Sequence, residues 1–278
     1  MKILMSNDDG VHAPGLLALY QALSTIAEVV VVAPSNEQSG SASALSISAP
    51  LYTHKLDSGF IAVNGSPADC IYLALHELYR HTSFDWVITG INSGANLGQD
   101  VLFSGTFGAA LTAQLFGIPA IATSLVGGGV NGEGQEQAGH YQMAANEIVK
   151  LLTDTPILDA CKNLPYHVLN VNIPDVKSAA AIKGRKITAL GHSQIARPVH
   201  HVVDPRGRDA YWLSLRKRQR QRQHQCQQEL LTENESIESS EIEMTDDQAV
   251  AAGYISLSPV RLHHTPDAAL ETLSALVL

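Results

Sequence analysis

The chain has 278 residues, of which 45% are hydrophobic and 16% are charged. This balance is typical of a globular protein with a sizeable core and excludes a largely disordered chain. The formal net charge of −9 argues against a nucleic acid polymer as partner, because such partners are bound by basic surfaces.

Strands and helices alternate through the first part of the chain. We expect strands at 2–6, 28–33, 86–89, 120–124 and 166–171, and helices at 15–26, 68–79, 104–116 and 142–152. Residues 29–32 are all valine, and a strand that is apolar on both faces is typical of a parallel sheet covered on both sides. The alternation predicts an α/β fold with a doubly wound, mostly parallel sheet, in which ligands bind beyond the carboxyl ends of the strands.

One long stretch without ionisable side chains, between Asp100 and Glu133, needs its own interpretation. Its length alone is enough for a membrane span. It also contains Gln114, Pro119 and several glycines, so we interpret it as a buried helix followed by a buried strand. We expect no membrane association.

The cysteines indicate the compartment. Cys70, Cys161 and Cys226 are far apart and match no metal-binding spacing. An odd, scattered set favours a reduced, cytoplasmic protein. The first apolar run, residues 3–5, is too short for a signal peptide and is soon followed by two acids.

Beyond residue 175 the pattern changes to short strand candidates, at 186–190, 210–213 and 254–259. We therefore predict a catalytic core at 1–175 and, at 176–278, a C-terminal extension with β-hairpins that packs on the core. Residues 215–244 carry a basic run and then a glutamate-rich run, and we interpret them as a solvated helix or a disordered loop. An RNA-binding arm is the alternative, although the acidic run favours self-neutralisation.

Two adjacent carboxylates, Asp8 and Asp9, follow the first predicted strand and precede Gly10. Two like charges at this position are costly unless a cation joins them, and a turn at glycine lets both converge on one hard divalent metal. The alternative is a solvated turn, because Asn, Asp and Gly are favoured turn residues.

Three later segments supply groups of the kind that a metal and a phosphate use, at the same predicted edge of the sheet. They are the serine-rich loop 34–43, the asparagine- and glycine-rich segment 90–98, and the helix start 103–106. A helix start presents free amides and the positive end of the dipole to an anion. Singly, these segments can be a mobile loop, a tight turn and an ordinary helix cap; together on one edge they favour a site.

Competing motifs are missing from the sequence. No glycine-rich loop ends in Gly-Lys-Ser or Gly-Lys-Thr, and no Gly-x-Gly-x-x-Gly follows the first strand. The pairs His200–His201 and His263–His264 lack the spacing of a zinc site. His12 is the histidine that lies nearest to the two carboxylates in sequence.

The ordered motifs resemble the SurE family of survival proteins, which are metal-dependent 5'/3'-nucleotidases. The resemblance covers nearly the whole chain and is carried by segments 6–15, 32–34, 39–40, 65–70, 90–98, 104–106, 170–174, 204–208, 211–212 and 253–256. The chain departs from the family pattern after Trp212, where the charged segment is longer than usual.

This resemblance implies a Rossmann-like core whose C-terminal extension exchanges hairpins between subunits, giving a homodimer or a homotetramer. It implies one divalent cation per subunit, Mg²⁺ or Mn²⁺. Its implied ligands are Asp8, Asp9, Ser39 and Asn92, and the residues implied around the phosphate are Asn96, Ser104, Gly105 and Thr106.

We therefore expect a phosphomonoesterase acting on nucleoside 5'-monophosphates, with 3'-monophosphates and short polyphosphate as further candidate substrates. Asp8 and Asp9 are the candidate catalytic residues, and the sequence leaves open which of them orients or deprotonates the attacking water. A haloacid dehalogenase-type phosphatase is disfavoured, because its acids have an Asp-x-Asp spacing. The alternative of another class is a non-catalytic sensor of nucleotide or metal.

Overall fold

The computed structural model describes the chain except residues 128–134, 155, 165, 192–198, 214–243 and 262–278. The chain forms two compact units, one made of Met1–Gly191 with Met244–Leu278 and the other of His192–Glu243. Each is described by itself below. The predicted charged segment 215–244 lies almost wholly outside the described residues.

The larger unit is built on a nine-stranded sheet with the order β3-β4-β2-β1-β5-β6-β7-β11-β8. Strands β1, β2, β4, β5, β6 and β7 run parallel, while β3 and β11 are antiparallel to β4 and β7. This confirms the predicted mostly parallel α/β sheet. The strands are β1 Lys2–Ser6, β2 Glu28–Pro34, β3 Thr53–Lys55, β4 Ile61–Val63, β5 Trp86–Ser93, β6 Ala120–Leu125, β7 His167–Ile173, β8 Arg185–Ile187 and β11 Ile255–Arg261.

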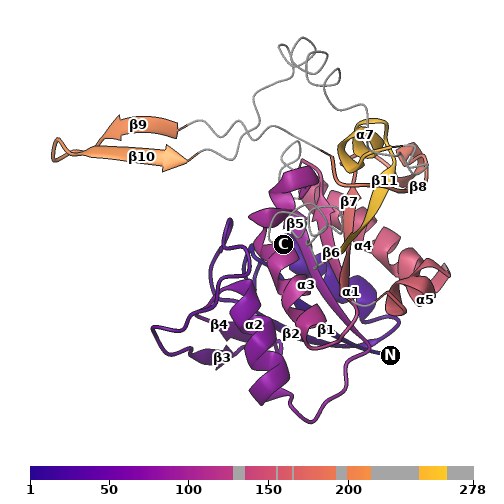
Figure 1. The fold of residues 1–278 in the computed structure, drawn as a ribbon, viewed down its shortest axis with the longest axis horizontal. Helices are drawn as coiled ribbons and strands as arrows, with labels where there is room; N and C mark the ends of the chain where they lie inside the picture. The colour runs from indigo at the N-terminus through magenta and orange to yellow at the C-terminus, as the bar shows by residue number, and fades with distance from the viewer. Residues whose placement is uncertain (128–134, 155, 165, 192–198, 214–243, 262–278) are drawn as a thin grey trace, which may run out of the picture. The chain divides into compact units, whose positions relative to one another are not determined.

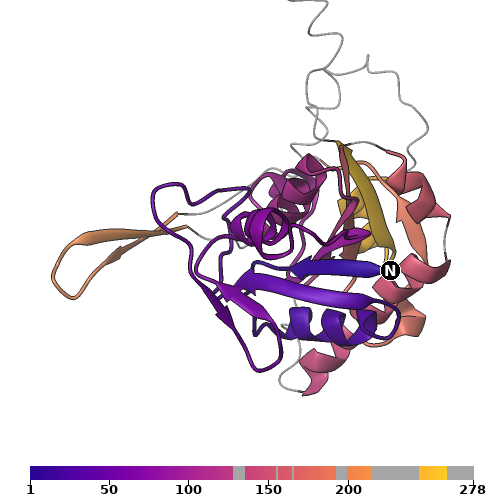
Figure 2. The same ribbon diagram turned by 90° about the horizontal axis from the view of Figure 1, so that it is seen from below.

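Helices cover both faces of this sheet (Figures 1 and 2). Helices α1, α4 and α5 share one apolar core with the sheet, and α2 and α3 share another. The helices are α1 Pro14–Leu23, α2 Pro67–Leu73, α3 Gly105–Leu115, α4 Gln135–Asp154, α5 Ile157–Lys162 and α7 Asp246–Ala251, with a π-helical stretch at Ala74–Leu78 and 3-10 helices at Gly98–Leu102 and Ala179–Ala181.

The central strand β1 shows how the sequence specifies this double layer. Ile3 and Met5 pack in the core beneath α1, while Leu4 packs in the core beneath α2 and α3. Successive side chains of a strand point to opposite faces, so an unbroken apolar run is what a strand covered on both sides requires.

The uncharged stretch forms α3 and β6, as predicted. Nearly every residue of α3 and every residue of β6 is buried, so the lack of charge reflects a protein interior. Among the helices that the structure describes, none has both the length and the apolar character needed to span a bilayer.

Strand β5 is longer than the predicted strand 86–89. It continues to Ser93, with a shift in its register against β6 between Thr89 and Asn92. Asn92 therefore lies in the end of a strand, where the sequence predicted a loop. Gly90 breaks the side-chain pattern there, but the backbone pairing continues beyond it.

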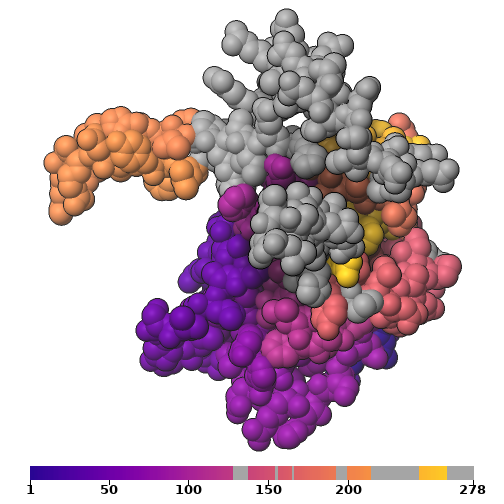
Figure 3. Space-filling model, viewed as in Figure 1, coloured from indigo at the N-terminus to yellow at the C-terminus, as the bar shows by residue number. Residues whose placement is uncertain are grey.

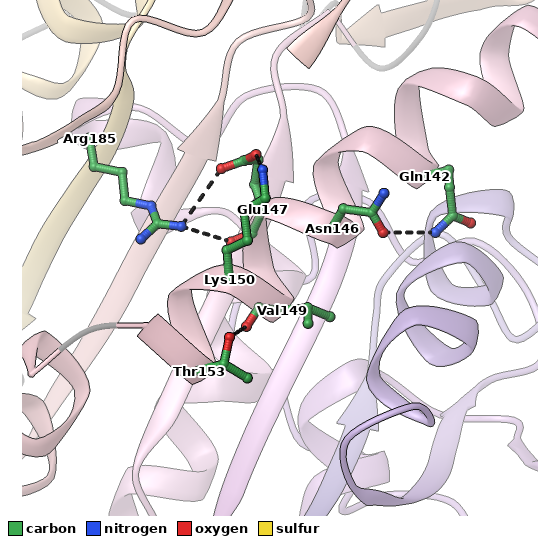
Figure 4. A network of polar contacts seen from close by, with 7 residues as sticks. All are labelled: Gln142, Asn146, Glu147, Val149, Lys150, Thr153 and Arg185. Atoms are coloured by element: carbon green, nitrogen blue, oxygen red, sulfur yellow. Dashed lines mark hydrogen bonds and ion pairs between the residues drawn. The ribbon is translucent and has the colours of Figure 1, made fainter. Parts of the chain in front are cut away.

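The last two strands of the sheet come from the region predicted as an extension. β11 pairs with β7 and β8, and Arg185 of β8 reaches α4 (Figure 4). Its Nη2 lies 3.7 Å from Oε2 of Glu147, whose Oε1 lies 2.7 Å from Nζ of Lys150. The contact of Arg185 with Glu147 links the edge strand β8 to α4, while the pair of Glu147 and Lys150 lies within α4. The domain boundary near residue 175 stays a prediction.

The described part of the smaller unit is a β-hairpin of β9 (Val199–Val203) and β10 (Asp209–Leu213), seen as a slender body in Figure 3. Val203 pairs with Asp209, and Val199 pairs with Leu213. The sequence predicted β10 but not β9. Most of the hairpin is exposed, including Tyr211, Trp212 and Leu213.

The topology fixes where a ligand can bind. From β1 the chain moves to β2 on one side and later to β5 on the other side, which makes β1 the switch point of the sheet. Crevices form outside the carboxyl ends of the strands at such a point. The segments after β1 and β2 and the end of β5 meet there.

Candidate active site

Asp8 lies just beyond the end of β1 and is 4% exposed. Burial raises the pKa of its carboxyl, while hydrogen bonds from Thr106 act in the opposite direction. Both the Thr106 hydroxyl and its backbone amide donate to this carboxylate. The first turn of α3 therefore holds Asp8 in place.

Asp9 is less buried than Asp8 and is held from a different strand. The backbone amide of Ser93 donates to its Oδ2 at 2.9 Å. Burial and then the neighbouring charge of Asp8 raise the pKa of Asp9 to about 6. Glu37, from the loop after β2, adds a further negative charge near both carboxylates.

The charges described around Asp8 and Asp9 are all negative. In the part of the chain that the structure describes, neither Asp8 nor Asp9 takes part in an ion pair. A buried and a partly buried carboxylate side by side, without a cationic side chain, carry a large desolvation cost. A hard divalent cation would offset that cost, so the residues present fit such an ion.

Ser39 and Asn92, the other two expected ligands, come from segments that flank the pair. The Ser39 hydroxyl donates to Oε1 of Glu37 at 2.8 Å, and Gln38 N donates to the Asp8 carbonyl at 2.7 Å. Asn92 donates its side-chain amide to Gly94 O at 2.8 Å, which leaves its Oδ1 for a cation.

The donor set decides which kind of metal fits. Among the described residues no three His, Cys, Asp or Glu side chains form a metal-binding group. An ion here would need hydroxyl, amide or water oxygens in addition to the two carboxylates. An all-oxygen set of this kind suits Mg²⁺ or Mn²⁺ and disfavours zinc.

The start of α3 lies against the carboxylates. Ser104 is the N-cap, and its Oγ accepts a hydrogen bond from Phe107 N at 3.0 Å, so its own proton remains for another acceptor. A Cβ on Gly105 would lie 2.6 Å from Ser41 Oγ and 2.9 Å from Asp8 Cβ. Only glycine lets the helix approach the pair this closely.

Two of the expected phosphate-binding residues have other partners in this structure. The Thr106 hydroxyl donates to Asp8, as described above. The Asn96 side-chain amide donates to Ser124 Oγ at 2.9 Å. The Thr106 and Phe107 amides also have partners, in Asp8 and Ser104. The Ser104 hydroxyl and the backbone amide of Gly105 are therefore the donors best placed for an anion.

Asn96 is fixed by a buried amide network. Its backbone amide donates to Asn172 Oδ1, and its carbonyl accepts from the side-chain amides of Asn170 and Asn172, all within 2.9–3.0 Å. These contacts join the segment after β5 to β7. In the sequence, Asn170 and Asn172 stand out only as part of the motif 170–174.

Sequence reasoning missed Glu37 and Ser93 as members of the site. Glu37 lies within the serine-rich loop 34–43, but its position two residues before Ser39 gives no sign that it approaches the two carboxylates. The contribution of Ser93 is a backbone amide, which carries no side-chain signal.

The sequence of the chain matches a known protein family. The family model described as survival protein SurE matches residues 3–197. The chain belongs to the SurE family. This confirms the family that the sequence motifs indicated.

Relatives within the SurE family match the chain along its full length. "5'-nucleotidase SurE" of Psychrobacter cryohalolentis is 77% identical over 278 residues, covering 100% of both chains. The protein of the same name from Acinetobacter baylyi is 43% identical with the same coverage. The crystal structure of the SurE protein from Aquifex aeolicus has a TM-score of 0.72 and 30% identity, covering 100% of both chains. This similarity confirms the α/β fold.

Proposed function

We propose that this SurE family chain is a phosphomonoesterase that uses one divalent cation, Mg²⁺ or Mn²⁺, to hydrolyse nucleoside 5'-monophosphates to nucleoside and phosphate. The names of its full-length relatives support the nucleotidase activity. The observation that supports the metal dependence is the pair of buried Asp8 and partly buried Asp9, which has no cationic side chain paired with it among the described residues.

Asp8, Asp9, Ser39 and Asn92 would hold the cation. When bound, it supplies charge neutralisation and a water of lowered pKa. Asp8 serves mainly as a fixed ligand, because its Oδ1 already accepts from Thr106. Asp9 is the better placed of the two to orient the attacking water, since it is less buried and is held through Oδ2 by Ser93 N.

The start of α3 would hold the phosphate. The Ser104 hydroxyl and the amide of Gly105 donate to its oxygens, and the helix dipole favours negative charge there. Asn96 positions the segment after β5 through its contacts with β7. The protein thus contributes positioning and electrostatics, which are the main requirements of phosphoryl transfer.

We further propose that the protein forms a homodimer or a homotetramer through its hairpin. Tyr211, Trp212 and Leu213 are 65%, 70% and 74% exposed, and a hairpin alone is marginally stable in water. Burial of these side chains against a second subunit would stabilise it. Light scattering of Trp212→Ser should show a lower mass than that of the wild type; an unchanged mass would contradict the assignment.

The first experiment is phosphate release from AMP and 3'-AMP, with EDTA and with added Mg²⁺ or Mn²⁺. We expect turnover that requires the cation and is lost in Asp8→Asn and Asp9→Asn. Short polyphosphate is the third substrate to test. Absence of turnover with every cation, together with retained AMP binding, would favour the alternative of a non-catalytic sensor.

A further inference from the structure

Tyr141 of α4 is a buried tyrosine that reaches the end of β5. Its side chain is 2% exposed and packs in the core that α1, α4 and α5 share with the sheet. Its hydroxyl is hydrogen-bonded to the side chain of Ser93, and the backbone amide of Ser93 donates to Oδ2 of Asp9. Ser93 therefore links the helix layer to one of the two carboxylates of the proposed metal site.

The ring of Tyr141 lies against α1 and close to β5. A Cβ at Gly15 would lie 3.0 Å from Tyr141 Cε1 and 2.1 Å from Ile91 O. Because Gly15 has no side chain, α1 can approach both the ring and the strand. The ring is thus packed beside the part of β5 that leads directly to the expected ligand Asn92 and to Ser93.

The residue before Tyr141 anchors the start of α4 to the end of β7. Nδ1 of His140 contacts Oδ1 of Asp175, and these side chains are only 13% and 6% exposed. Asp175 follows the last residue of β7 by two positions. The contact restrains α4 one residue before Tyr141, so the tyrosine hydroxyl is held at a fixed place relative to the carboxyl ends of the strands.

The charges around the Tyr141 hydroxyl show that it lies near Asp9. Burial raises the pKa of Tyr141, the hydrogen bond to Ser93 lowers it, and the charges of Asp9 and Asp175 raise it further. The phenol is therefore neutral at neutral pH and keeps its proton for hydrogen bonding. A buried hydroxyl of this kind can fix its partner without adding charge to the site.

We propose that Tyr141 is a positioning residue of the proposed metal site. By holding the side chain of Ser93, it keeps the Ser93 amide directed at Asp9 and so fixes the carboxylate that binds the cation and orients the attacking water. This inference rests on the proposed function and adds to it a residue that acts through Ser93. Residues that orient ligands in this way affect metal affinity as well as turnover.

The test compares Tyr141→Phe, Ser93→Ala and the double variant by calorimetry of Mn²⁺ binding. Tyr141→Phe keeps the ring, and Ser93→Ala keeps the backbone amide. We expect each single variant to bind Mn²⁺ about fivefold more weakly, in line with the loss of one hydrogen bond. The double variant should also lose about fivefold, because both changes break the same bond, whereas independent effects would multiply to about 25-fold.

Kinetics with AMP at saturating Mn²⁺ give a second readout. Tyr141→Phe should lower kcat about fivefold and keep KM within about twofold, because it leaves the proposed phosphate donors at the start of α3 unchanged. Tyr20→Phe is the matched control, since Tyr20 packs against the same core, with its ring centroid 4.7 Å from that of Phe60. It should keep the Mn²⁺ affinity and both kinetic constants of the wild type.

Urea unfolding in EDTA separates positioning from a purely structural role. A loss of stability in Tyr141→Phe with the Mn²⁺ affinity of the wild type would overturn the inference. Multiplied losses in the double variant, or absence of Mn²⁺ binding by the wild type, would overturn it too. A wild type that binds Mn²⁺ but releases no phosphate would refute the hydrolase, while a coupled loss of Mn²⁺ affinity in the variants would still support the role of Tyr141.

Discussion

The hydroxyl of Thr106 donates a hydrogen bond to Oδ1 of Asp8, a carboxylate that is 4% exposed. The two residues are 98 positions apart in sequence and join the end of β1 to the start of α3. This contact fixes one proposed metal ligand to the helix that would bind the phosphate.

Replacing Thr106 by valine should therefore reduce both the stability of the fold and the activity. Thr106→Val keeps the shape and removes the donor, and a hydrogen bond to a charged group contributes about 1.5–3 kcal/mol. We expect kcat/KM for AMP to fall about tenfold or more. Thr106→Ser, which retains the hydroxyl, should keep most of the activity; an equal loss in both variants would contradict the role of this hydrogen bond.

Adding a side chain at Gly105, in the same first turn of α3, should cause a steric clash. In Gly105→Ala the new methyl group would meet Ser41 Oγ and Asp8 Cβ at 2.6 and 2.9 Å, so we expect phosphate release to be nearly abolished. The control is Gly139→Ala in α4, where no atom lies within 4 Å of the added Cβ. That variant should keep activity and gain roughly 0.5–1 kcal/mol of stability.

The raised pKa of Asp9 predicts that the stability of the metal-free protein depends on pH. Its pKa is about 6 in the folded chain and roughly 3.9 in an unfolded chain, so the folded state binds more protons between these values. The free energy of unfolding should then decrease as pH rises from about 4 to about 6, by up to about 3 kcal/mol. Urea unfolding in EDTA measures this slope.

In Asp9→Asn this slope should be smaller, with the remainder due to Asp8, whose pKa is also raised. Added Mn²⁺ at pH 7 should stabilise the wild type and leave Asp9→Asn almost unchanged. Asp57→Asn, at an exposed carboxylate, is the control and should behave as the wild type. A wild-type slope in Asp9→Asn would show that Asp9 does not titrate as described.

Replacing Asp246, which lies far along the chain from the site residues, should have a large effect on stability. It is completely buried, and its carboxylate accepts hydrogen bonds from Gly98 N at 2.7 Å and Gly191 N at 2.8 Å. Asp246→Ala would leave both amides without this partner, at about 1–3 kcal/mol for each buried donor. We expect a loss of about 3 kcal/mol in urea unfolding, against none for Asp57→Ala.

The sequence predicted the central strands and α3 well, because their apolar runs are long and mark fully buried elements. It missed β3 and β4, which have three residues each, and every residue of β3 is exposed. Strands this short are defined by backbone pairing and carry almost no periodic signal. The central strand β5 was predicted to end before Asn92 for a different reason, because Gly90 interrupts its side-chain pattern while the backbone pairing continues.

For the site, the motifs brought Asp8, Asp9 and the start of α3 to one edge, and the structure places these three together. The partner of each side chain could not be predicted. Thr106 donates to Asp8, and Asn96 donates to Ser124, because these contacts depend on how strands and helices distant in sequence approach each other. Their spacing along the chain contains no such information.

The amide network around Asn96 has a consequence for how the site responds to its surroundings. Asn96, Asn170, Asn172 and Ser124 are uncharged and do not titrate near neutral pH, and they brace the ends of β5, β6 and β7 with buried hydrogen bonds. Changes in ionic strength and pH near neutrality should therefore have little effect on this hydrogen-bond network. Any response of the site to pH or salt should therefore arise at the carboxylates that this network supports.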